Sequence, residues 1–99
     1  MAEPIDFEGK RRLCRTMAVN LPALRAKLGL SQDDLADRLG FSRQTISAIE
    51  NGKREMQWST FSAMALFFAR DKELEDLMVV MGILTTSLED FMNAEAKKM

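Results

Sequence analysis

The sequence contains no histidine and only one cysteine, Cys14. A single cysteine cannot form an intramolecular disulfide, and without histidine it lacks the usual partner of a thiol nucleophile or a zinc site. We therefore expect Cys14 to be a small, partly buried apolar residue in a reducing compartment. Phosphate-binding glycine loops, nucleotide fingerprints and catalytic triads are also missing. The sequence thus predicts a protein that is not an enzyme and that uses no cofactor and no metal.

Long hydrophobic runs are absent as well. No apolar stretch approaches the roughly 20 residues that cross a bilayer, and residues 1–30 lack the apolar region and cleavage site of a signal peptide. We therefore expect a cytoplasmic protein with no membrane contact. Glycine and proline number only five and two, and no internal repeat or low-complexity linker interrupts the chain. With 99 residues, 46% of them hydrophobic, the chain can bury the core of one compact domain.

No window alternates apolar and polar residues as a half-buried strand does, whereas spacings of three and four recur throughout. The fold class predicted is therefore all-α. We expect the first main helix to begin at Asn20 as its N-cap, to tolerate Pro22 in its first turn and to end at Gly29. Residues 13–19 would add a helical turn or two before it.

Two short helices are expected next. Ser31 can cap a helix that ends at Gly40, and Ser42 can cap another that buries Ile46 and Ile49 and ends before Gly52. Two helices of about eight residues joined by a short glycine-containing turn form a helix-turn-helix.

Three further apolar stripes complete the predicted organisation. One covers residues 58–68, a second covers residues 74–81 and ends at Gly82, and a third begins at Thr86 with the spacing of a capping box. We divide the chain into a partly helical N-terminal segment (1–19), a helix-turn-helix domain (20–70) and a C-terminal helical extension packed on the same domain (71–99).

The second helix of the pair has an unusual outward face. On a helical wheel, Gln44, Ser47, Ala48 and Asn51 lie opposite the buried Ile46. A solvated face usually carries long charged side chains, whereas this one is short, largely neutral and rich in amide and hydroxyl groups. Such a face suits close approach to base edges in the major groove of DNA. The alternative is a well-capped amphipathic surface helix.

The charge distribution also differs between the two halves. Residues 1–54 carry ten Lys or Arg against seven Asp or Glu, a balance of +3, whereas residues 55–99 carry four against eight, a balance of −4. The first half is therefore where a polyanion would be tolerated.

The segment "LRAKLGLSQDDLADRLGFSRQTISAIENGK" resembles the phage repressor and Cro type of helix-turn-helix domain, the XRE family. The likeness covers residues 21–68 and depends on "LRxxxGLSQxxLA", the Gly40 turn and "SxxTISxIENG" at the family's spacing. It implies a lambda-repressor-like bundle of about five helices with an additional C-terminal helix. It also implies a homodimer that binds paired half-sites in double-stranded DNA, as a transcriptional regulator and most simply as a repressor.

The resemblance further implies roles for individual residues. The base-reading residues would be Arg43, Gln44, Thr45, Ser47 and Ala48. The residues that hold the DNA backbone would be Gln32, Asn51, Lys53 and Arg54. Ala36 would be the small residue under the recognition helix, and Arg25 and Glu50 would form a structural ion pair.

The C-terminal part departs from the family pattern. "MQ" replaces the usual Pro-Ser cap at residues 56–57, and "MVVMGILTTSLEDF" is similar to small bacterial regulators with an extra helical segment. Its apolar surface predicts a dimer interface, with residues 13–19 as the second candidate for that contact. An antitoxin that binds a protein partner through these helices is the alternative function. The predicted dimer-interface residues are Val79, Val80, Ile83 and Leu84.

Overall fold

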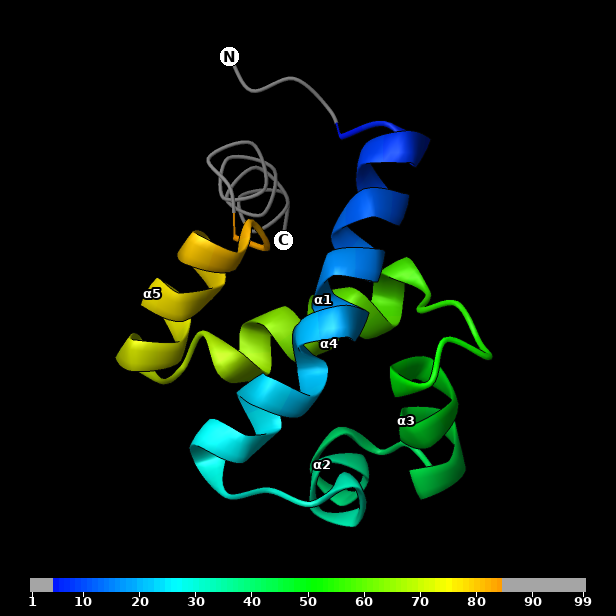
Figure 1. The fold of residues 1–99 in the computed structure, drawn as a ribbon, viewed down its shortest axis with the longest axis vertical. Helices are drawn as coiled ribbons and strands as arrows, with labels where there is room; N and C mark the ends of the chain where they lie inside the picture. The colour runs from blue at the N-terminus through cyan, green and yellow to red at the C-terminus, as the bar shows by residue number, and fades with distance from the viewer. Residues whose placement is uncertain (1–4, 85–99) are drawn as a thin grey trace, which may run out of the picture.

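The computed structural model describes residues 5–84, and these residues form helices without any strand. The predicted all-α fold is therefore confirmed. Figure 1 shows α1 running through the middle of the molecule, with α4 crossing behind it. The predicted helix from Thr86 lies outside the described residues. The helices are α1 (Phe7–Leu28), α2 (Gln32–Leu39), α3 (Arg43–Glu50), α4 (Trp58–Phe68) and α5 (Lys72–Met81).

The beginning of α1 differs from the prediction. Asp6, not Asn20, caps this helix by accepting a hydrogen bond from the Gly9 amide at 2.7 Å. Asn20 lies inside α1, where its side-chain amide donates to the Thr16 carbonyl at 2.8 Å. Pro22 is also internal, although an internal proline costs about 3 kcal/mol.

Packing explains why α1 continues through Pro22. Leu13, Met17, Leu21 and Leu24 follow one another at intervals of three and four, and all four are buried. This apolar stripe crosses the position of the predicted cap without a break. Its burial therefore offsets the backbone hydrogen bond that Pro22 cannot form.

The core lies between α1 and α4. Phe61, Met64 and Phe68 of α4 are fully buried, and Phe61 stacks on the half-buried Trp58 with the ring centroids 4.9 Å apart. Leu74 and Met78 bring α5 onto the same core. As predicted, the apolar stripes of α4 and α5 are the faces that the structure buries.

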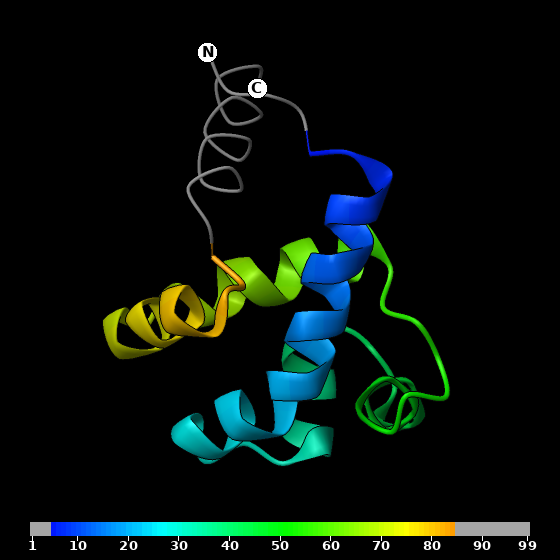
Figure 2. The same cartoon turned by 45° about the horizontal axis from the view of Figure 1, so that its top comes forward.

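The helix-turn-helix and α5 lie on opposite sides of α1 and α4, as both views show (Figures 1 and 2). Three acidic residues at and after the start of α5 make contacts within that helix. Asp71 caps it by accepting from the Leu74 amide at 3.1 Å, and Lys72 pairs with Glu75 and Asp76. Four acidic residues, Asp71, Glu73, Glu75 and Asp76, thus lie on the side of the molecule away from α3. Within residues 5–84, no helix has both the length and the apolar character needed to cross a bilayer.

Candidate nucleic-acid interface

The turn between α2 and α3 is fixed by three residues, Gly40, Phe41 and Ser42. Gly40 ends α2 with φ 77°, a left-handed conformation that glycine adopts without strain. The Phe41 amide donates back to the Ala36 carbonyl at 2.9 Å, and Ser42 caps α3 by accepting from the Thr45 amide at 3.1 Å. Ala36 is 2% exposed, which leaves room for α3 to pack over it. These contacts set the angle at which α3 leaves the body of the domain.

The outward face of α3 presents two different kinds of side chain. Arg43 and Gln44 in the first turn are exposed, and neither side chain has a hydrogen bond or ion pair with any other residue between 5 and 84. The Thr45 hydroxyl, in contrast, lies 2.9 Å from the Ser42 hydroxyl, and Ser47 accepts from the Asn51 side chain at 3.4 Å. Arg43 and Gln44 are therefore the side chains most available to a ligand.

The loop after α3 is held close to the end of that helix. The amides of Lys53 and Arg54 both donate to the Ala48 carbonyl, at 2.9 and 3.2 Å, while Gly52 takes φ 76°. Lys53 is exposed to solvent, and the Arg54 guanidinium reaches back to the Thr45 hydroxyl at 3.5 Å. Positive charge is thus fixed beside the outward face of α3.

A buried ion pair joins α1 to the inner side of α3, as the sequence predicted. Arg25 Nε donates to Glu50 Oε2 at 2.7 Å, and Arg25 Nη2 donates to Glu50 Oε1 at 2.9 Å. The side chains are only 16% and 6% exposed, respectively. The hydrogen bonds to Glu50 raise the pKa of the Arg25 guanidinium above its ordinary value. The Arg25 guanidinium therefore keeps its positive charge near neutral pH.

Gln32 belongs to the same network. Its side-chain amide donates to Glu50 Oε1 at 3.0 Å, and Arg25 Nη1 also donates to the Leu30 carbonyl at 2.9 Å. Gln32 is half-buried at the first position of α2. Its side chain thus links α2 to the ion pair, and its backbone amide stays at the positive end of the α2 dipole.

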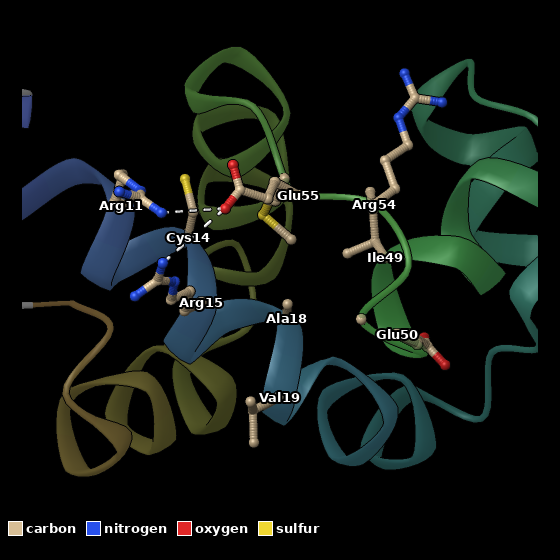
Figure 3. Close-up of a pocket in the computed structure, with 11 residues that line it drawn as sticks. Arg11, Cys14, Arg15, Ala18, Val19, Ile49, Glu50, Arg54 and Glu55 are labelled. Atoms are coloured by element: carbon tan, nitrogen blue, oxygen red, sulfur yellow. Dashed lines mark hydrogen bonds and ion pairs between the residues drawn. The ribbon is translucent and has the colours of Figure 1, made fainter. Parts of the chain in front are cut away.

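A groove of about 340 Å³ lies between α1 and the segment that leaves α3 (Figure 3). Arg11 and Arg15 extend into it from α1 and both contact Glu55, at 3.3 and 4.0 Å between N and O atoms. Sequence reasoning missed these three residues. The one signal for them is the run "KRRLCR", in which Arg11 and Arg15 are four apart and so lie on one face of a helix.

Cys14 lies in the floor of this groove and is 6% exposed. Burial, with a smaller contribution from the nearby Glu55, raises the pKa of its thiol. A raised pKa keeps the thiol protonated near neutral pH. Cys14 therefore has the environment of the apolar structural residue that the sequence predicted.

The predicted dimer-interface residues separate into two groups. Val79 and Val80 on α5 are 52% and 83% exposed, whereas Ile83 and Leu84 are 0% and 7% exposed. The expectation that Ile83 and Leu84 add to an open apolar surface was wrong. Gly82 reverses the chain with φ 80°, and the amides of both following residues bond to the Met78 carbonyl. Their side chains consequently turn into the core of the same chain.

The fold and this surface define a helix-turn-helix protein of the DNA-binding type. A helix-turn-helix family model matches residues 23–71, about half of the chain. An uncharacterized HTH-type transcriptional regulator from Methanocaldococcus jannaschii is 41% identical over 63 residues, which cover 64% of this chain and 92% of that protein. Another, from Methanothermobacter thermautotrophicus, is 36% identical over 56 residues, covering 57% and 80%. No solved structure matches the chain. The chain belongs to the XRE-type helix-turn-helix family of DNA-binding transcriptional regulators.

Proposed function

We propose that this protein is a sequence-specific regulator, most simply a repressor, that binds paired half-sites in double-stranded DNA as a homodimer. The observation that carries the proposal is the outward face of α3. Arg43 and Gln44 project from its first turn without partners among residues 5–84, and the small Ser47 and Ala48 follow them. A helix with this face can approach base edges closely in the major groove.

The proposed division of labour follows the positions of the side chains. A guanidinium at Arg43 can pair with two acceptors of guanine, and the amide of Gln44 can pair with two atoms of adenine. Thr45 already bonds to Ser42, so its contact with bases would be mainly through its methyl group. Ser47 and Ala48 would allow close contact with the groove.

The backbone-binding residues flank this face. Lys53 and Arg54 supply positive charge from the loop after α3, and Asn51 supplies an amide at the end of that helix. Gln32 would offer its backbone amide to a phosphate, since its side chain is engaged with Glu50. These contacts would fix the register of α3 on the duplex without reading sequence.

Repression would then result from occupancy. A dimer bound across a promoter excludes polymerase from the same stretch of DNA, and this mechanism needs neither catalysis nor a cofactor. The acidic α5 lies on the side of the molecule away from α3 (Figure 2). Repulsion from phosphate would keep that side away from the duplex and free for contact with a second subunit.

Replacing Gln44 with alanine should weaken binding to the operator, the DNA sequence that the native protein prefers, by roughly 1–3 kcal/mol, because one bidentate base contact is lost. The loss of preference should concentrate at one base pair. Lys53→Ala should instead weaken binding to all sequences about equally and lower the slope of log affinity against log salt by about one unit. Fluorescence anisotropy with operator and scrambled duplexes, measured over a series of salt concentrations, separates the two effects.

The two variants are each other's controls, because both positions are exposed and neither substitution disturbs the core. If both substitutions cause the same loss on operator and scrambled DNA, the proposed division between base-reading and backbone-binding residues is wrong.

A further inference from the structure

Arg11 and Arg15 are one turn apart on α1 and share a single carboxylate. Arg11 Nη2 and Arg15 Nη2 lie 3.3 and 4.0 Å from the same oxygen, Oε1 of Glu55 (Figure 3). Glu8 also pairs with Arg11, with 3.7 Å between Glu8 Oε1 and Arg11 Nη1. Two guanidinium groups thus compete for one carboxylate oxygen, and each keeps N–H groups that could bind another anion.

The position of Glu55 connects this cluster to the proposed DNA-binding surface. Glu55 is two residues after Lys53 and directly follows Arg54, in the segment that leaves α3. Arg11, Arg15 and Arg54 all line the groove between α1 and that segment. The groove therefore places the two α1 arginines opposite the loop that carries Lys53 and Arg54.

The contacts of Glu55 are exposed and therefore easily exchanged. The side chain of Glu55 is 78% exposed, and those of Arg11 and Arg15 are 36% and 65% exposed. Exposed ion pairs of this kind contribute little to stability, because solvent screens them and the side chains lose freedom. Arginine binds phosphate well, since its planar fork can donate two hydrogen bonds at once.

Both arginines lie outside the part of the chain that the family model matches, which begins at residue 23. Their placement comes from the length of α1, which begins at Phe7 and carries them alongside the loop after α3. The two arginines therefore reach the loop from outside the matched helix-turn-helix segment, whereas Glu55 lies within it.

We propose that Arg11 and Arg15 form an additional phosphate-binding surface beside Lys53 and Arg54, and that Glu55 competes with DNA phosphate for these two arginines. The proposal rests on the DNA-binding function proposed above. Glu55 would thereby lower the affinity of the protein for any duplex, whatever its sequence. Removing its charge should expose up to two further phosphate contacts.

The test compares Glu55→Gln with a matched control, Glu73→Gln. Both glutamates are 78% exposed and both form ion pairs, that of Glu73 being with Lys27 at 3.8 Å on another part of the surface. Each substitution changes the net charge equally. Binding to a random-sequence duplex is measured by fluorescence anisotropy over a series of NaCl concentrations. Thermal unfolding, monitored by circular dichroism, verifies that each variant folds.

We expect Glu55→Gln to steepen the slope of log affinity against log salt by about one to two units and to tighten binding at low salt by on the order of tenfold. Glu73→Gln should leave the slope unchanged. Adding Arg11→Gln and Arg15→Gln to the Glu55→Gln variant should remove the gain, because these side chains supply the new contacts.

Three results would overturn the proposal. The first is an unchanged slope of log affinity against log salt in Glu55→Gln, and the second is an equal gain in affinity in Glu73→Gln. The third is weaker binding by Glu55→Gln, which would mean that Glu55 instead holds the loop in its binding position. A native chain that binds no duplex at any salt concentration would contradict the proposed DNA-binding function itself. If the native chain binds duplex DNA and its affinity falls with salt in the ordinary way, any of the three results would contradict only the proposed role of Glu55.

Discussion

Replacing either Arg25 or Glu50 with alanine should lower the free energy of unfolding by about 3–5 kcal/mol. Each substitution leaves a charge in a site where the side chains are only 16% and 6% exposed. Loss of Glu50 also removes the acceptor of the Gln32 amide, and loss of Arg25 removes a donor to the Leu30 carbonyl. Because the pair connects α1, α2 and α3, its loss should also loosen α3 on the domain.

Urea denaturation of the two single variants and of the double variant Arg25→Met/Glu50→Leu tests this expectation. The double variant removes both charges and fills the space, so its cost should be well below the sum of the single costs. Glu73→Ala is the control: its exposed pair with Lys27 should change stability by at most about 1 kcal/mol. In a double-mutant cycle made of Arg25→Ala, Glu50→Ala and the variant that carries both alanines, additive costs would exclude the coupling.

Val80→Asp should produce a folded monomer that binds operator more weakly by on the order of 10²-fold or more. Val80 is 83% exposed and its neighbour Val79 is 52% exposed, so a carboxylate here costs the single chain almost nothing. In a dimer built on this surface, however, the same carboxylate would be buried without a partner. One subunit covers only one half-site, and the two recognition helices of a dimer lie about 34 Å apart on one face of the duplex.

Val19→Asp is the matched control for that experiment. Val19 is 79% exposed, but it lies on α1, in the segment that was the second candidate for the interface. Sedimentation velocity should therefore show a dimer for Val19→Asp and a monomer for Val80→Asp. The opposite pattern would place the interface on α1. A native chain that sediments as a monomer would instead leave the α5 surface to a different protein.

The helix-turn-helix could be predicted closely because its signals are local. Ser31 and Ser42 cap α2 and α3 through amides three residues ahead, and Gly40 ends α2 in the left-handed conformation. Such contacts act within one turn, so the sequence spacing alone specifies them. Arg25 and Glu50 are 25 residues apart in the sequence, and their ion pair was predicted only from the resemblance to the family.

The errors arose where tertiary contacts decide the outcome. Asn20 and Pro22 have the composition of a helix start, but the buried stripe from Leu13 to Leu24 keeps α1 continuous through them. Ile83 looked like part of an open surface, because the turn that buries it depends on how α5 sits on the core. These positions were set by packing, which overrides local preference.

The contact of Glu55 with Arg11 and Arg15 was missed for a related reason. The arginines are at least 40 residues away from Glu55 in the sequence and approach it only when α1 packs beside the loop after α3. The count of charged residues showed that residues 1–54 carry a balance of +3. It could not show that the carboxylate of the next residue, Glu55, lies beside Arg11 and Arg15.

Selection of bound sequences from a random pool of double-stranded DNA tests the central claim most directly. With the native protein at low salt, we predict enrichment of one motif in two related half-sites spaced by about one helical turn. The same selection with Gln44→Ala should relax the preference at one base pair of each half-site and preserve the spacing. If the native protein binds DNA but enriches no sequence, α3 does not read bases, and the proposed sequence-specific regulation would be contradicted.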